Sequence, residues 1–493
     1  MNALVLLGNQ LFDNKFINKF KNSHLIYMAE DISLCTYVKH HKQKIYYFLA
    51  SMREYRDLLN KKGYKLFYSE LKDSVKTKSY FDNLLKFIKK NNIYEISVFE
   101  IEDKLFESNF LKFLNNNKIK CEFLNSPMFL TTRNEFQSLF KNKKPLMTTF
   151  YQYQRKKLAI LMDNDKPLGG QWSFDKENRK RVPKEYESPR INTYKSKYFE
   201  EISNIIDKYF SNHFGIISKN SIFPFNRKDS LLELDFFLTT KLDNFGHYED
   251  FIQDDQSPIN HSLLSAPLNL GLITPYDITS SVDNIDIYKV GLNNLEGYVR
   301  QVIGWREFIR GVNQIYSENM LKSNFFKNNR SLTKDWYEGT TSIKIFDDLV
   351  NNLKKRGYSH HIPRLMVASN LMNLTGIKPI EVYKWFMTTY IDSSDWVMIP
   401  NVFGMGLYSD GGIFASKPYI CGSNYLLKMS NYKKGVWADI VDGLYWNFIK
   451  KNENFFKKNP RLSIMSIALN RMSDSKLKAH ITNAEKFINE YSN

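Results

Sequence analysis

A chain of 493 residues exceeds the size at which a single hydrophobic core stops growing, about 250 to 300 residues, so we expect two domains. Lysine and arginine outnumber aspartate and glutamate by 70 to 52, and a net charge of +18 makes nucleic acid the first partner to consider, although a Lys-rich composition alone gives the same balance. Three widely spaced cysteines without a CxxC pair argue against a disulfide framework, and no apolar run approaches the roughly 18 residues of a membrane span, so we expect a cytoplasmic protein without membrane insertion.

Residues 1–130 alternate short apolar runs with amphipathic stretches, which predicts an α/β domain with a doubly wound parallel sheet. Five segments have the composition of strands: 3–7, 24–28, 64–68, 93–99 and 120–124. Between the second and the third, apolar residues from Ile45 to Leu59 recur at spacings of three and four, which predicts a long helix ending near Gly63. Neither G-x-G-x-x-G nor Walker A follows a predicted strand, so this fold class by itself implies no nucleotide.

Residues 131–222 are basic and irregular, with a break at Gly169-Gly170, and we interpret them as a long connection with some helix. From residue 223 to 493 helical spacing dominates, as in Tyr298, Val299, Val302 and Ile303, which predicts an all-α second domain.

Within this helical part, residues 357–370 (GYSHHIPRLMVASN) are the most informative. Pro363 has no N–H and belongs in the first turn of a helix, so His360 and His361 are expected at a helix N-terminus. Arg364 then lies one turn beyond His361 on the same face. Paired histidines taken alone are more often structural than catalytic, so the pair needs further support.

That support is a resemblance. The string from His360 to Ser369 resembles the flavin-site helix of the photolyase/cryptochrome proteins, in which an arginine and a downstream aspartate pair beside the isoalloxazine of FAD. The resemblance assigns these roles to Arg364 and Asp395, and it places Asn401 near flavin N5.

Three further stretches resemble the same family in the same order. Residues 258–269 (PINHSLLSAPLN) resemble its phosphate-contacting segment, residues 304–308 (GWREF) its Trp-Arg-Glu-Phe, and residues 6–11 (LLGNQL) the start of its antenna domain. The resemblance therefore covers essentially the whole chain. It adds six residues to the FAD contacts: His261, Ser262, Leu263, Leu264, Ser265 and Glu307.

Residues 167–180 and the DGG at 410–412, followed by Lys417-Pro418-Tyr419, resemble the prokaryotic (6-4) photolyase group in particular. This resemblance implies a monomer that acts on UV-damaged DNA. The implied reaction reverses (6-4) pyrimidine photoproducts by electron transfer from excited reduced FAD, with a histidine assisting proton transfer.

The resemblance also implies roles in this reaction. His361 is the expected proton donor, and His360 supports it. Tyr419 and Tyr425 match lesion-contacting tyrosines. The alternative is that both are core tyrosines whose hydroxyls are hydrogen-bonded within the protein. Trp385 matches the inner member of the electron-transfer path that reduces the flavin, whereas simple helix packing would explain it equally well without the match. Tyr337 falls where an outer tryptophan is usual, and Phe386 stands where the group tends to have tyrosine.

Two accessory sites are implied as well. Asn9, Gln10 and Tyr37 match positions that line a lumazine-type antenna site, but Leu34 stands where an acidic ligand is expected. Asp175, Glu177 and Asp250 resemble acidic residues near a Mg²⁺ ion, although carboxylates in a basic region more often pair with lysine and arginine.

One feature departs from the group, which usually carries four cysteines that hold an iron-sulfur cluster. The corresponding stretches, 341–345 and 431–446, contain no cysteine. Because a cluster needs thiolate ligands, we expect none here and expect Ile345, Val436 and Trp437 to fill the space.

Two other functions stay open at this point. A cryptochrome-like blue-light photoreceptor would bind FAD and repair nothing, and a nucleic-acid-binding protein without flavin could use the same scaffold. The histidine pair and the basic charge favour repair, because signalling requires neither.

Overall fold

The computed structural model describes residues 1–77 and 79–493. The chain begins with a five-stranded parallel sheet in the order β3-β2-β1-β4-β5. Its strands are β1 (Asn2–Val5), β2 (His24–Ala29), β3 (Leu66–Ser69), β4 (Glu95–Phe99) and β5 (Lys120–Leu124). All five lie where the sequence predicts them, to within two residues at their ends. The doubly wound α/β region is therefore confirmed.

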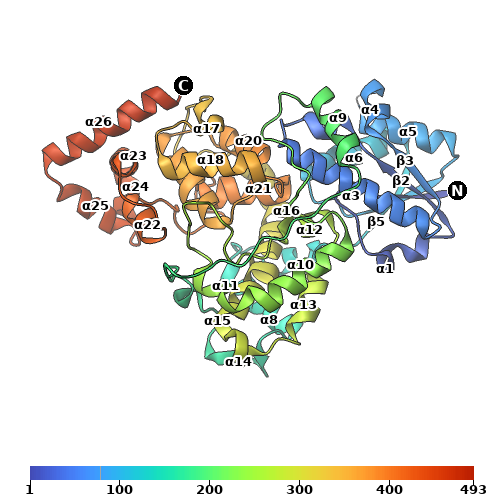
Figure 1. Ribbon diagram of the computed structural model, residues 1–493, viewed down its shortest axis with the longest axis horizontal. Coiled ribbons are helices and arrows are strands. Elements are labelled where there is room, and N and C mark those ends of the chain that lie inside the picture. The colour runs from blue at the N-terminus through green and yellow to red at the C-terminus, as the bar shows by residue number, and fades with distance from the viewer. Residues whose placement is uncertain (78) are drawn as a thin grey trace.

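Alternate strand residues are buried on opposite faces of the sheet, as the two-residue period of a strand requires. Leu4 and Ile26 pack on one face with α3 (Lys42–Lys61), and Val5 packs on the other with α5 (Tyr80–Lys90) and α6 (Lys104–Asn117). The long helix predicted between the second and third strands is α3, which ends just before Gly63 at φ 74°. Both faces of the sheet are thus covered by helices (Figure 1).

The stretch 131–222 contains α7 (Arg133–Leu139), α8 (Met147–Leu158), the short strands β6 (Met162–Asp163) and β7 (Lys166–Pro167), and α9 (Phe199–Tyr209). Its helices reach both parts of the molecule. α9 packs on α3 of the sheet region, whereas α8 packs on η4 (Arg300–Arg306) of the helical part. Figure 1 shows α9 beside α3 and shows α8 among α11, α15 and α13.

The rest of the chain is helical, which confirms the all-α second part. Its helices run from α10 at residue 227 to α26 at residue 491, and α26 lies far from the sheet (Figure 1). They are α10 (Arg227–Thr240), α11 (Leu242–Tyr248), α12 (Ser265–Leu270), α13 (Pro275–Val282), α14 (Ile287–Val290), α15 (Leu292–Val299), α16 (Glu307–Leu321), α17 (Asp335–Glu338), α18 (Lys344–Arg356), α19 (Asn370–Thr375), α20 (Pro379–Thr389), α21 (Asp395–Ile399), α22 (Ser423–Lys428), α23 (Val436–Lys451), α24 (Glu453–Lys458), α25 (Ser463–Asn470) and α26 (Asp474–Tyr491). Short helices near the sheet are α1 (Asn14–Ile17), α2 (Ile32–Thr36) and α4 (Leu71–Thr77).

Three segments of this helical part are π-helical: η4, η5 (Pro363–Ser369) and η6 (Pro400–Gly406). The helix that contains η5 starts at His361, so Pro363 lies in its first turn as the sequence predicts. Within the described residues, no helix combines the length and the apolar character that crossing a bilayer requires.

Candidate functional site

A cavity of about 680 Å³ lies among the three π-helical segments. Residues of η4, η5 and η6 line it together with the start of α8 and the loop that precedes α12. π-Helical turns are rare and occur frequently at functional sites. Three of them around one cavity mark it as the candidate site.

Arg364 and Asp392 form a bidentate ion pair in the wall of this cavity. The guanidinium donates from Nη1 to Asp392 Oδ1 at 2.9 Å and from Nη2 to Oδ2 at 3.0 Å, and its Nε donates to the Ser359 carbonyl at 2.9 Å. Ser265 Oγ donates to the same carboxylate at 2.6 Å, and the guanidinium lies 4.1 Å from the centre of the Tyr390 ring. These contacts hold the pair in one orientation.

The predicted pairing of Arg364 with Asp395 is therefore wrong. Asp395 is the first residue of α21, does not line the cavity, and accepts a hydrogen bond from the Tyr383 hydroxyl. Its other neighbour is Asp103, from the sheet region. Asp392 lies three residues before α21, whereas Asp395 is its first residue, and the two carboxylates have different partners. The sequence offered both aspartates at similar spacing from Arg364 and contained no signal that separates them.

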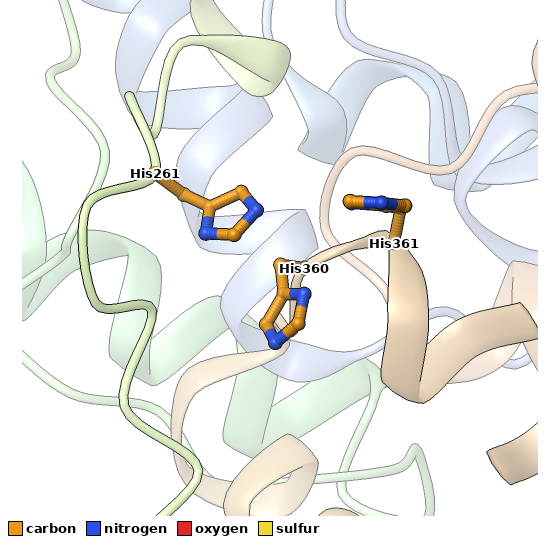
Figure 2. A group of neighbouring side chains, drawn as sticks. All are labelled: His261, His360 and His361. Carbon is orange, nitrogen blue, oxygen red and sulfur yellow. The ribbon is translucent and has the colours of Figure 1, made fainter. Parts of the chain in front are cut away.

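Three histidines meet in the cavity wall (Figure 2). The rings of His261 and His360 are stacked, with centroids 4.5 Å apart and planes at 23°. The His361 ring lies 5.8 Å from each of them. His261 was predicted as a phosphate-loop residue and not as a neighbour of the histidine pair, because sequence separation hides this contact.

His361 is the accessible member of this cluster, with 48% of its side chain exposed. Its Nε2 lies 3.1 Å from Asp250 Oδ1. Desolvation alone would lower the pKa of His361, but the hydrogen bond and the negative charge of Asp250 outweigh it and raise that pKa. Burial and the charge of His361 lower the pKa of His261 to about 3. Burial likewise lowers the pKa of His360, so His361 is the member of the cluster that carries a proton most readily.

The residues predicted to contact cofactor or lesion divide into two groups. Most line the cavity: Ser262, Leu263, Leu264, Ser265, Asn401 and Tyr419. Glu307 and Tyr425 do not. The Glu307 carboxylate instead accepts the backbone N–H groups of Leu130 and Thr131, at 2.9 and 3.0 Å, and so joins α16 to the segment after the sheet.

Comparisons with known proteins agree with this geometry. Residues 4–221 match the family described as deoxyribodipyrimidine photo-lyase-related protein, and residues 298–418 match the FAD binding domain of DNA photolyase. Over 492 residues the chain is 32% identical to a protein of Agrobacterium fabrum named (6-4) photolyase, and the alignment covers 96% of each. The chain belongs to the photolyase family.

Solved structures show the same fold. A bacterial class III photolyase from Agrobacterium tumefaciens superposes with a TM-score of 0.58 at 17% identity, over 100% of this chain and 96% of that one. A cryptochrome from Synechocystis superposes with a TM-score of 0.58 at 16% identity, over 97% of this chain and 93% of that one.

The cavity of this photolyase-family chain fits FAD. Several buried polar atoms in its lining residues have no partner among the described residues, including Arg306 Nε, Trp396 Nε1 and Tyr298 Oη. A buried donor left unpaired costs about 1 to 3 kcal/mol, so these groups favour a ligand that brings acceptors. The diphosphate and the ring carbonyls of FAD are such acceptors, and the FAD-binding match includes Arg306, Arg364 and Trp396.

Trp385, predicted as the inner member of the electron-transfer path, lies behind Phe386 of the cavity wall. Trp385 is fully buried, and its ring lies 5.1 Å from that of Phe386, which lines the cavity. Its indole N–H donates to the Trp336 carbonyl at 2.9 Å, and Phe346 bridges the two rings at 5.9 and 4.9 Å. Trp336, next to the predicted Tyr337, thus contacts Trp385 directly. The role of Tyr337 as the outer member of the path stays a prediction.

Two of the three acidic residues predicted for a Mg²⁺ site, Asp175 and Asp250, form ion pairs with arginines. Asp175 lies 2.5 Å from Arg179 and 3.4 Å from Arg300, and Asp250 lies 3.7 Å from Arg179. Glu177 does not line the cavity. Among the described residues these carboxylates form no group close enough to share one ion, so the Mg²⁺ site stays a prediction.

The residues predicted for an antenna site are separate from this cavity. Gln10 is 2% exposed, and its amide is bonded to the backbone of Leu7, Phe99 and Glu100. Tyr37 is 55% exposed, and its ring lies 4.9 Å from that of His40. Asn9 is partly buried. Of the three, Tyr37 presents the most free surface to a ligand.

Two of the three residues that were expected to fill the space of an iron-sulfur cluster are buried. Ile345 and Trp437 are buried, as expected. Val436 is 78% exposed, so the prediction that it fills this space is wrong. Tyr432, from the same stretch, is buried beside Trp437, with ring centroids 6.3 Å apart. Its hydroxyl donates to Asp348 and accepts from Gln256, both at 3.0 Å.

Proposed function

We propose that this photolyase-family protein binds FAD in the cavity and uses light to reverse (6-4) pyrimidine photoproducts in DNA. The observation that carries the proposal is the position of His361, a protonatable and half-exposed side chain in the wall of the cavity that also contains the Arg364–Asp392 pair. Bound reduced FAD, when excited, supplies the electron that no side chain can supply.

The residues of the chain would hold the cofactor by charge and hydrogen bonds. Asp392 holds Arg364, and Ser265 holds Asp392. The orientation of the guanidinium in the cavity wall is therefore fixed before any ligand binds. The unpaired Arg306 Nε and Trp396 Nε1 are available to acceptors on the cofactor.

His361 would deliver the proton. In a (6-4) lesion a hydroxyl or amino group has moved between two bases, and its return requires a proton. Asp250 Oδ1 holds His361 Nε2, so Nδ1–H of the charged ring remains to donate. A base flipped out of the duplex would reach this exposed ring, and Tyr419 in the cavity wall offers it a stacking face.

Four accessory statements belong to the same proposal. We expect no iron-sulfur cluster, because stretches 341–345 and 431–446 contain no cysteine. A lumazine-type antenna near Tyr37 and a Mg²⁺ ion near Asp250 remain predictions, as does the monomeric state. Iron analysis and release of bound chromophores from the purified protein test the first two.

The decisive assay exposes the reduced protein to blue light with oligonucleotides that carry a single (6-4) or a single cyclobutane lesion. We expect repair of the (6-4) lesion. Repair of the cyclobutane lesion alone would overturn the assigned specificity. Repair of neither, with intact light-driven reduction of the flavin, would favour a blue-light photoreceptor.

A further inference from the structure

The histidine cluster has the composition and placement of a metal site. His261, His360 and His361 each offer one ring nitrogen, and these nitrogens all lie within 4.8 Å of one another (Figure 2). His261 comes from the loop before α12, whereas the other two come from the start of the helix that contains η5. We infer that the three imidazoles bind one divalent transition-metal ion of the Zn²⁺ class, with an open coordination position toward the cavity.

Two of these nitrogens are buried and form no hydrogen bond with a described residue. His261 is 8% exposed and His360 is 4% exposed, and Nε2 of each ring has no hydrogen-bond partner among the described residues. His261 Nδ1 lies 2.8 Å from the Pro258 carbonyl, which can only accept, so Nδ1 carries the proton and the Nε2 lone pair is free. In His360 the Ile362 N–H donates to Nδ1 at 3.4 Å, a long hydrogen bond, so an ion that binds at Nε2 would displace the proton from that nitrogen.

The groups behind the rings are those that orient metal-binding histidines. A ligating imidazole usually donates its other N–H to a carbonyl or a carboxylate, and such contacts fix the ring. His261 has the Pro258 carbonyl in this position, and His361 has the Asp250 carboxylate at 3.1 Å. With Nε2 of His361 directed to Asp250, its Nδ1 is the nitrogen left for an ion.

The distances between the three ring nitrogens suit a small ion once the rings move slightly closer together. Zn–N bonds of about 2.0 to 2.1 Å in a tetrahedral site separate the nitrogens by about 3.4 Å. His361 is half exposed, so its ring can rotate inward. Imidazole ligands favour Zn²⁺, Cu²⁺ and Ni²⁺, whereas Mg²⁺ and Ca²⁺ prefer oxygen. All three residues line the cavity, so the fourth position faces it.

Metal binding and proton donation would exclude each other at His361, because a nitrogen that coordinates an ion cannot donate a proton. Zn²⁺ should therefore inhibit repair. This consequence rests on the proposed function, whereas metal binding itself does not.

The test titrates the purified, FAD-loaded protein in the dark and without DNA. Zn²⁺ binding is followed by calorimetry, and Co²⁺ binding by visible absorption at wavelengths where oxidised flavin absorbs little. We expect one ion per chain, and an excess of Mg²⁺ should not displace it. His261→Asn should lower the Zn²⁺ affinity by more than about 100-fold, and Asp250→Asn, which removes only the orienting carboxylate, by about 10- to 100-fold. The matched control, His480→Asn on α26, should bind as the unchanged protein does.

Bound flavin and circular dichroism establish that each variant is folded. Should His261→Asn fail to fold, Asp250→Asn carries the test. No saturable binding with a Kd below about 1 mM, or unchanged affinity in the folded variants, would overturn the inference. A protein that binds Zn²⁺ in this pattern but repairs no lesion would leave the metal site standing and overturn the proposed function alone.

Discussion

Asp392 and Asp395 are three residues apart, yet they lie in opposite electrostatic environments. Asp392 faces the cavity and is paired with Arg364 and Ser265. Asp395 accepts a hydrogen bond from the hydroxyl of Tyr383 in α20 and lies near a second carboxylate, that of the partly buried Asp103 from the sheet region. One aspartate completes an ion pair at the site, and the other contributes to a like-charge contact between the two parts of the molecule.

The difference shows that burial of a carboxylate does not by itself indicate a ligand-binding role. Burial and the charge of Asp395 raise the pKa of Asp103, and burial raises the pKa of Asp395 as well. Lys44 is close enough to attract both carboxylates, but burial lowers its own pKa to about 8. The stability of the Asp103–Asp395 contact should therefore depend on pH. The Arg364–Asp392 pair should instead be sensitive to removal of either partner.

Asp392→Asn is expected to have the largest effect. It leaves the Arg364 guanidinium without its paired charge, and breaking a buried ion pair in this way costs roughly 3 to 5 kcal/mol. Arg364 retains 19% exposure, so we expect about 3 kcal/mol less stability, near the lower end of that range, together with loss of most bound FAD. Urea unfolding and the ratio of flavin to protein measure the two effects.

Asp395→Asn is the matched control. It changes the same chemical group three residues away and should leave FAD occupancy near normal. Loss of FAD in Asp395→Asn with retention in Asp392→Asn would restore the pairing expected from the family resemblance.

Asp103→Asn should change how stability depends on pH. The folded protein binds a proton at Asp103 more readily than the unfolded chain, whose carboxyl pKa is about 3.9. The free energy of unfolding therefore falls as pH rises from that value through the raised pKa, by at most about 1.4 kcal/mol per pH unit for this group. The asparagine can still accept the Trp396 N–H but does not titrate.

Unfolding curves at several pH values between 4 and 8 test this. The stability of Asp103→Asn relative to the unchanged protein should increase with pH across that window. A constant difference would show that Asp103 is not perturbed by its contact with Asp395.

Tyr383→Phe should have the smallest effect. It removes the hydroxyl that donates to Asp395 and leaves the ring in place. A hydrogen bond to a carboxylate contributes about 1.5 to 3 kcal/mol, and we expect a loss of about 1.5 kcal/mol. Thermal unfolding at neutral pH measures the effect, and FAD binding should not change, because Tyr383 does not line the cavity. A loss of FAD comparable to that of Asp392→Asn would connect Asp395 to the site after all.

The fold could be predicted to a large extent because its signals are local. Short apolar runs at residues 3–7 and 93–99 became β1 and β4, and helical spacing from Ile45 to Leu59 became α3. The wall of the cavity was also predictable in part, since Arg364, His361 and the 261–265 segment carry distinctive strings and do line it.

What failed depends on which way a side chain faces after a turn. Asp395 is the first residue of α21 and Asp392 lies three residues before it, so a shift of three residues exchanges the partners of the carboxylate. The prediction for Glu307 failed for the same reason. Its sequence neighbours match the family, but its carboxylate accepts hydrogen bonds from the backbone of Leu130 and Thr131. Only tertiary contacts decide such cases.

The central claim is that the cavity performs repair through His361 and does not merely hold a flavin. The most direct test measures (6-4) repair per absorbed photon for the unchanged protein and for His361→Asn, with FAD occupancy, photoreduction and DNA affinity measured alongside. General acid catalysis is typically worth about 10² to 10⁴ in rate, so repair should collapse in the variant while the other three quantities stay near normal. An unchanged repair yield in His361→Asn would contradict the account.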